Sequence, residues 1–379
     1  MSIRQMFLGS IVKPGFNPLA AQTPSYTYNL LSWGQGSKGA LGLGNTTYYS
    51  SPVQVGSLTD WLVLSSAQYS SYGIKTNGTL WSWGQNYNAG QLGLGNTTDY
   101  SSPKQVGALT AWSQVVGLQY GAYALKTDGT MWSWGANGLG QLGIGNTTDY
   151  SSPKQIGALT TWAYIGAPVF NAFAIKTDGT LWAWGYGLSG QLGLGNTTAY
   201  SSPKQVGSLT NWSSITGAST SAIATKTDGT MWTWGSNAQG QLGLGNTTDY
   251  SSPKQVGALT NWYKVNGGNS SFFATKTDGT LWAWGNNGSG RLGLGNITNY
   301  SSPKQVGTLT TWKEARMGRN GNSSFGLKTD GTLWAWGVNG SGQLGLNNAT
   351  NYSSPVQVGS LATWFQVAPG LNSTIALKY

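Results

Sequence analysis

The chain has 379 residues, of which 39% are apolar and only 8% are charged, and its formal net charge is +10. A chain of this length and apolar content can bury a large core, which excludes a disordered protein, and it contains no run of 18 apolar residues that would span a membrane. The absence of Cys and His excludes disulfides, thiolate or imidazole catalysis and the commonest metal ligands.

The first 25 residues belong to no repeat. An apolar stretch near their start is interrupted by Lys13 and Pro14, which argues against a cleaved secretory signal. We therefore interpret residues 1–25 as a peptide that attaches the protein to another subunit, and residues 26–379 as a single domain. The candidate attachment residues are Arg4, Phe7, Leu8 and Phe16.

A unit of about 50 residues recurs seven times from residue 26 onward. Each unit contains a Trp-Gly dipeptide, a Gly-rich stretch such as Gly90–Gly107, a Leu-Thr-x-Trp motif, a short variable segment and, in most copies, the sequence Lys-Thr-Asp-Gly-Thr. Repetition at this period indicates a repeat architecture. All 20 Trp residues fall in three repeated positions, so we interpret them as scaffold and not as a ligand site. The Trp-Gly dipeptides begin at Trp33, Trp83, Trp134, Trp184, Trp234, Trp284 and Trp336.

Each unit is expected to form four short antiparallel strands. The Asp-Gly pair, as at Asp128–Gly129, lies between two apolar segments and predicts a hairpin with a type I′ turn. On the next strand Trp132 and Trp134 share one face, and the residue between the paired Trp is small in every copy. Sheets of this kind can pack face to face, and each buried Trp contributes about 2–3 kcal/mol. The sequence therefore predicts an all-β, seven-bladed β-propeller of four-stranded antiparallel blades.

The two ends of the chain carry complementary parts of one unit. Residues Tyr26–Gly34 hold a Trp-Gly strand, which we take as the last strand of a blade, and the final unit stops at Lys378–Tyr379, where its turn is due. We predict that this N-terminal strand pairs with the C-terminal strands in one shared blade and closes the ring. An open solenoid is the alternative, and it would leave two unpaired sheet edges.

The combination of Trp-Gly, Gly-Gln-Leu-Gly-Leu-Gly and Asp-Gly elements resembles the repeat of the regulator of chromosome condensation family, from Tyr26 to Tyr379. The resemblance implies a seven-bladed propeller. It leaves function open, since that family includes a nucleotide-exchange factor that docks on chromatin, adaptor domains and a secreted bacterial inhibitor of β-lactamases. The His-Ser pair that the family often carries between its second and third strands is absent, as is any insertion resembling the projecting wedge of the exchange factor. These departures argue against nucleotide exchange.

Position-specific function is expected where the units differ. One variable zone precedes each Asp-Gly hairpin and a second follows each Trp-Gly dipeptide, and the alternation of antiparallel strands places both zones on one rim of the propeller. The first units contribute aromatic side chains and the sixth contributes basic ones, which suits a protein partner or an anionic glycan. Loop drift on a surface that binds nothing is the alternative. The candidate rim residues are Tyr69, Tyr87, Tyr120, Phe170, Tyr186, Arg291, Arg316 and Arg319.

The sequence gives little support for nucleic-acid binding, catalysis, or metal or cofactor binding. Single Lys residues follow Ser-Ser-Pro in five units, but the lack of Arg clusters and exposed stacking aromatics argues against nucleic acid as a partner. Only 10 acidic residues are present, mostly in turns, and no catalytic pair, metal-ligand cluster or cofactor-binding motif is found. We therefore expect no enzyme activity and no cofactor.

Two classes of function remain. The first is a structural or adhesive module of a phage virion or a microbial surface, held by residues 1–25. The near-identical units and the uncharged, Gly/Ser/Thr/Asn-rich surface favour this class and a location on a virion or outside the cell. The second class is a soluble protein-binding or inhibitory propeller of the β-lactamase-inhibitor type, for which a cytoplasmic location is also open. A chromatin or nucleotide-exchange regulator ranks third.

Overall fold

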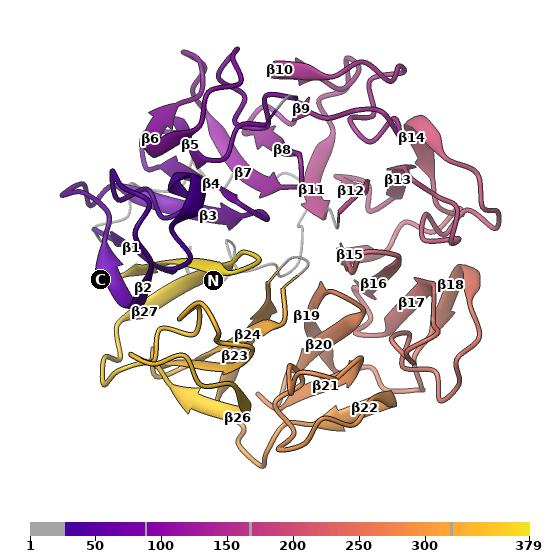
Figure 1. Ribbon diagram of the computed structural model, residues 1–379. Coiled ribbons are helices and arrows are strands. Elements are labelled where there is room, and N and C mark those ends of the chain that lie inside the picture. Colours follow the sequence, from indigo (N-terminus) through magenta and orange to yellow (C-terminus); the bar gives the residue numbers. More distant parts are fainter. Residues whose placement is uncertain (1–26, 88, 167–168, 319–320) are drawn as a thin grey trace.

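The computed structural model describes residues 27–379 except for residues 88, 167–168 and 319–320. Its strands form seven four-stranded antiparallel sheets that radiate from a central axis, so the predicted seven-bladed propeller is confirmed (Figure 1). The first strand of each sheet lies nearest the axis and the fourth lies at the periphery (Figure 1). The attachment residues predicted near the N-terminus lie outside the described residues, so that interpretation stays a prediction.

Six blades are built from strands that are consecutive in the chain. The first blade has β3 (Trp61–Ser66), β4 (Ser70–Lys75), β5 (Leu80–Gly84) and β6 (Tyr100–Gln105). The second has β7 (Trp112–Gly117), β8 (Gly121–Lys126), β9 (Met131–Gly135) and β10 (Tyr150–Gln155). The third has β11 (Trp162–Gly166), β12 (Asn171–Lys176), β13 (Leu181–Gly185) and β14 (Tyr200–Gln205).

The other three of these blades repeat the pattern. The fourth has β15 (Trp212–Gly217), β16 (Ser221–Lys226), β17 (Met231–Gly235) and β18 (Tyr250–Gln255). The fifth has β19 (Trp262–Gly268), β20 (Ser271–Lys276), β21 (Leu281–Gly285) and β22 (Tyr300–Gln305). The sixth has β23 (Trp312–Met317), β24 (Ser323–Lys328), β25 (Leu333–Gly337) and β26 (Tyr352–Gln357).

Both ends of the chain contribute two strands each to the closing blade. These strands are β1 (Asn29–Gly34), β2 (Tyr49–Gln54), β27 (Trp364–Pro369) and β28 (Ser373–Lys378), with a short 3₁₀ turn, η2 (Ser37–Gly39), between β1 and β2. Across the sheet the order is β2-β1-β28-β27, and β1 pairs with β28 along its whole length, beginning with Asn29 opposite Lys378. The predicted shared blade is confirmed, with β2 as a second N-terminal strand that the sequence did not predict.

The Trp-Gly strand is the third strand of each blade, and the prediction that it comes last is wrong. The fourth, outer strand is the Tyr-Ser-Ser-Pro segment, as in β6. The outer strand tolerates Pro103 because one of its edges has no neighbouring strand to receive a hydrogen bond.

The Asp-Gly sequences form hairpins, but the turn is not the predicted type I′. In the second blade the Lys126 N–H donates to the Thr130 carbonyl, and the Gly129 N–H donates to the Lys126 carbonyl. Gly129 has a φ of +77°, whereas Asp128 lacks the positive φ that a type I′ turn requires. Asp128 Oδ1 instead accepts hydrogen bonds from the Thr130 N–H and hydroxyl at 2.9 and 2.6 Å. The loop therefore has three residues and ends in a glycine bulge.

The second Trp of each pair joins neighbouring blades. Trp134 is fully buried, and its indole N–H donates to the Gln91 carbonyl of the preceding blade at 2.9 Å. A Cβ on Gly93, whose φ is +74°, would lie 2.7 Å from that indole nitrogen, which explains the glycine after Gln-Leu. The same bond recurs in other blades, from Trp184, Trp234 and Trp284. Each blade is thus fastened to the one before it by a buried indole.

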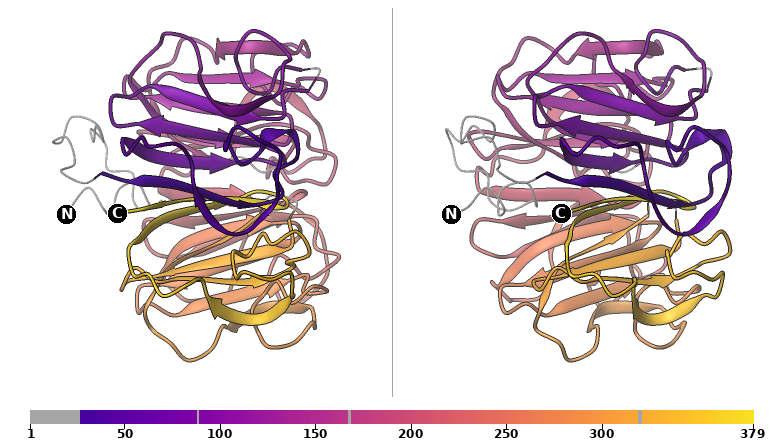
Figure 2. Two further views of the ribbon diagram at one scale, coloured as in Figure 1. Left: turned by 60° about the vertical axis from the view of Figure 1, so that its left-hand side comes forward. Right: turned by 90° about the vertical axis from the view of Figure 1, so that its left-hand side faces the viewer.

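The propeller has two faces with different loops. The loops that join first to second and third to fourth strands lie on one face, the rim face. The Asp-Gly hairpins and the Leu-Thr-x-Trp links between blades lie on the other, the link face. The described chain begins and ends on the link face, where the Tyr28 N–H donates to the Thr59 carbonyl and the Tyr379 N–H donates to the Thr363 carbonyl. Figure 2 shows the C-terminal end at one face of the ring.

Candidate functional site

The two variable loop zones meet on the rim face, as the sequence predicts. The Gln85 N–H donates to the Tyr69 carbonyl at 2.9 Å, and the Tyr186 N–H donates to the Phe170 carbonyl at 3.0 Å. The glycine of the Trp-Gly dipeptide permits this approach. Gly185 has a φ of +92°, and a Cβ there would lie 2.7 Å from the Phe170 carbonyl oxygen. The error in strand numbering leaves this placement intact, because both loops shift by one strand.

Aromatic side chains from three successive blades form what we call the aromatic arc of the rim face. Its members are Tyr69, Tyr87, Tyr120, Phe170 and Tyr186. Tyr87 is 58% exposed and Tyr120 is 42% exposed, while the other three are half-buried. The rings of Phe170 and Tyr186 pack edge to face with their centroids 6.5 Å apart. The arc therefore combines exposed rings with rings that their neighbours hold in place.

The two described Arg residues that were predicted for the rim lie below its surface or near the axis. Arg291, which replaces the Gln of other units, is 6% exposed and donates to the Asn269 carbonyl at 3.1 Å. Burial lowers the pKa of Arg291 to about 10. Arg316 lines a narrow polar hollow of about 60 Å³ among the inner strands, and Arg319 lies outside the described residues. The described Arg side chains are therefore separate from the aromatic arc. The prediction placed them on the rim because spacing in the sequence does not distinguish a buried position from an exposed one.

Three charged side chains form an axial charge cluster that the sequence did not reveal. They are Lys264 on β19 and Glu314 and Arg316 on β23. The Glu314 carboxylate lies 3.6 Å from Lys264 Nζ and 3.2 Å from Arg316 Nε, and Glu314 is 4% exposed. Burial alone would raise the pKa of Glu314, but Arg316, Lys264 and Lys313 hold it below its ordinary value. Burial lowers the pKa of Lys264 to about 8.

The depressed pKa of Lys264 predicts that stability depends on pH. Its folded-state pKa of about 8 lies below the ordinary 10.5, so the unfolded chain binds more protons than the folded chain between these values. The free energy of unfolding should therefore rise by about 1–2 kcal/mol from pH 8 to pH 10. Urea denaturation across this range measures the rise, which Lys264→Met should reduce. The exposed Lys104→Met serves as the control and should keep it; an equal rise in both variants would contradict the assignment.

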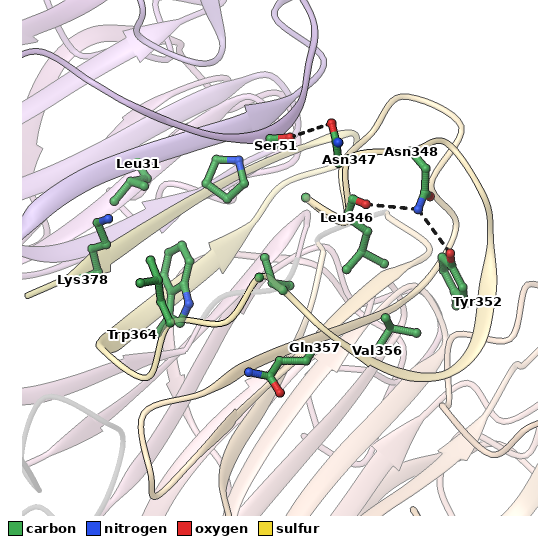
Figure 3. Close-up of a pocket in the computed structure, with 15 residues that line it drawn as sticks. Leu31, Ser51, Leu346, Asn347, Asn348, Tyr352, Val356, Gln357, Trp364 and Lys378 are labelled. Carbon is green, nitrogen blue, oxygen red and sulfur yellow. Dashed lines mark hydrogen bonds between the residues drawn. The ribbon is translucent and has the colours of Figure 1, made fainter.

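A hollow of about 470 Å³ lies at the periphery, at the junction between the sixth blade and the closing blade (Figure 3). Leu31 and Trp364 contribute to its apolar lining, and Lys378 lies at its edge (Figure 3). The Ser51 hydroxyl donates to Asn347 Oδ1 at 3.1 Å and so links the two blades beside it. The sequence offered one signal for this hollow, namely Leu31 where six other units have the first Trp of the pair.

Other features of the described residues are scaffold. No group of three or more acidic side chains within them could hold a metal ion, and none of their helices has the length and apolar character to cross a membrane. The five Lys residues of the outer strands each lie over a Tyr ring of the same strand, with the ammonium 5.1–5.6 Å from the centroid. They are spread one to a blade and form no dense basic patch.

The sequence repeats of this chain match a known protein family. The family described as "Regulator of chromosome condensation (RCC1) repeat" matches residues 29–71, 77–122, 128–167, 178–224, 228–274, 278–322 and 330–377. The chain belongs to the RCC1 repeat family. Each matched repeat begins at or just before a Trp-Gly strand and runs into the next blade, so one sequence repeat covers parts of two blades. This offset explains why the closing blade takes strands from both ends of the chain.

Curated relatives match a fraction of this RCC1-repeat chain. The human protein "Probable E3 ubiquitin-protein ligase HERC6" is 33% identical over 114 residues, which are 28% of this chain and 11% of HERC6. The "Ultraviolet-B receptor UVR8" of Arabidopsis thaliana is 33% identical over 109 residues, which are 27% of this chain and 24% of UVR8. The matched part therefore spans less than a quarter of each relative.

Solved structures match the whole propeller. Prp20p of Saccharomyces cerevisiae superposes with a TM-score of 0.84 at 17% identity, covering 100% of this chain and 96% of Prp20p. Human WBSCR16 superposes with a TM-score of 0.82 at 18% identity, covering 93% of this chain and 99% of WBSCR16. At this level of identity the likeness establishes the shared fold.

The hypothesis of a phage virion or surface-adhesive module is wrong. The relatives named above are a probable ubiquitin ligase and a light receptor by sequence and Prp20p by fold, and none of these is a virion protein. The hypothesis relied on near-identical units and a surface poor in charge. The likeness of the units has a structural cause, since each blade repeats the same turns and the same buried indole bonds.

Proposed function

We propose that this RCC1-repeat protein is a non-enzymatic platform that binds a protein partner through the aromatic arc of its rim face. The observation that carries the proposal is the exposure of Tyr87 and Tyr120 on adjacent blades, next to the packed pair Phe170 and Tyr186. Large aromatic side chains on rigid loops are the residues that dominate binding energy at protein interfaces, because they bury much area and lose little conformational freedom.

Relatives of known structure support a protein partner. The report of the Prp20p structure names its binding properties to Gsp1p and histones, and a second structure contains Kap60 bound to yeast RCC1 (Prp20). In this chain the specificity would come from the arc, since the arc lies where the blades differ. Arg291 is buried, Arg316 lines an axial hollow, and Lys38 on a neighbouring rim loop is paired with Asp99 at 3.9 Å, which favours a protein over an anionic glycan. The proposal includes no catalytic role, because the chain has no His or Cys and few acidic residues.

Capture from an extract of the source organism tests the proposal. The double variant Tyr87→Ala with Tyr120→Ala should reduce the recovered amount of a specific partner at least about tenfold, because the central aromatic side chains carry most of the binding energy. Leu209→Ala is the matched control, since Leu209 is 46% exposed but lies on the link face. Equal recovery with the wild type and the double variant would reject the aromatic arc as the binding surface.

A further inference from the structure

Five of the seven blades carry a Lys above the first-strand Trp and the first Trp of the Trp-x-Trp pair. In the fourth blade the Lys226 ammonium lies 5.0 Å from the Trp212 ring centroid and 3.7 Å from the Trp232 centroid. The same arrangement recurs around four other lysines, with distances of 4.9–5.1 Å to one ring and 3.7–4.5 Å to the other. In the second blade Lys126 instead pairs with Asp128 at 3.6 Å.

The closing blade has the same register but lacks one ring. Trp364 pairs with Lys378 as Trp212 pairs with Lys226, and Leu31 occupies the place of Trp232. Lys378 therefore lacks the second ring that its counterparts in other blades approach. Among the described residues it has no ion pair, hydrogen bond or ring contact.

The missing ring coincides with a larger hollow. The hollow beside Leu31 has about 470 Å³, against about 340 Å³ for the equivalent hollow beside Trp232. A second departure from the repeat adds to its apolar character, because Val356 lines it where five other outer strands have Lys. No carboxylate side chain lines the hollow. Figure 3 shows Leu31, Trp364 and Lys378 side by side at one end of it.

We infer that this hollow binds an aromatic side chain of a protein partner, next to a carboxylate of the same segment. The other blades show what fits, since there an indole occupies this position and its face receives the Lys ammonium. The carboxylate would pair with Lys378 from the open side. Residues 1–26 of this chain contain neither Asp nor Glu, so they lack the group that Lys378 requires. The site lies at the periphery, and its partner segment is independent of the one at the aromatic arc.

Three capped peptides test the site by titration calorimetry with the full-length protein. Acetyl-Asp-Trp-Asp-amide should bind, while acetyl-Lys-Trp-Lys-amide and acetyl-Asp-Ala-Asp-amide should each bind about tenfold more weakly or not at all, because one loses the charge match and the other the ring. Equal binding of all three, or binding of none, would overturn the proposal.

Variants locate the binding. Leu31→Trp should abolish binding by filling the vacant place, and Lys378→Met should weaken it about tenfold without any change in volume that would disturb the fold. Leu31→Met and Lys226→Met are the controls and should bind as the wild type does. Should Leu31→Trp fail to fold, Lys378→Met still decides; unchanged affinity there would overturn the proposal. A photo-cross-linker placed at position 31 that reacts with residues 1–26, or with a second copy of the chain, would also overturn it in favour of that occupant.

Discussion

Replacing Trp33 with alanine should lower the free energy of unfolding by about 3–5 kcal/mol. Trp33 is fully buried, and its indole N–H donates to the Gln343 carbonyl at 2.8 Å. Its ring packs edge-on against Phe325 and Trp364, with centroids 6.1 and 5.9 Å away. The substitution leaves a cavity between the sixth and closing blades and a buried carbonyl without its donor. Urea denaturation followed by circular dichroism measures the loss.

Trp234→Ala is the matched control, because Trp234 makes the same bond in a blade whose strands are consecutive. We expect a similar loss of unfolding free energy in both variants. Only Trp33→Ala should also accelerate hydrogen exchange of the β28 amides, because β1 and β28 belong to opposite ends of the chain and can separate without unfolding another blade. Equal protection of β28 in both variants would show that the closing blade is no weaker than the others.

Glu314→Gln should lower the free energy of unfolding by about 3–5 kcal/mol, because it leaves the Lys264 and Arg316 charges without their shared buried carboxylate. The double variant Glu314→Met with Lys264→Met should recover most of this loss, since well-packed apolar side chains can replace a buried ion pair at little cost. Thermal or urea denaturation of the two variants beside the wild type measures both effects. A loss below about 1 kcal/mol in Glu314→Gln would mean that water solvates the cluster.

The same carboxylate should affect stability in acid. Its pKa is held below the ordinary 4.5, so its contribution is present above about pH 4.5 and is lost as pH falls through the folded-state pKa. The wild type should therefore lose more stability than Glu314→Gln between pH 5 and pH 3. Denaturation midpoints at these two values check the sign, and a parallel decline in both proteins would assign the acid loss to other carboxylates.

Local chemistry accounts for the parts of the fold that could be predicted. The Trp-x-Trp pairs, the Asp-Gly hairpins and the 50-residue period all act within one unit, so the blade, the number of blades and the shared closing blade follow from the sequence. The two errors in strands and turns are local conflicts. The Tyr-Ser-Ser-Pro segment forms an outer strand that was not predicted, and Asp128 satisfied its hydrogen bonds with Thr130 in a three-residue loop where a two-residue turn was predicted.

The candidate sites were predicted less well, because they depend on exposure. Tyr87 and Tyr120 are exposed on the rim face as expected for a binding surface, but Arg291 is buried and bonded to a backbone carbonyl. Tyr87 and Tyr120 lie in the variable loops, whereas Arg291 takes the repeated Gln position, whose side chain is buried in other units. The axial charge cluster joins Lys264 and Glu314, which belong to the fifth and sixth blades and meet only when these two blades pack together.

The sequence by itself determined that this protein is a ring of seven alike blades, because short-range turn chemistry and a periodic set of buried indoles leave few other ways to bury them. Only the tertiary structure decided which of the differing residues face water, which face the axis and which face a neighbouring blade. The physical reason is that desolvation and pairing depend on contacts between residues some 50 or 300 positions apart, as between Lys264 and Glu314 or between Trp33 and Gln343.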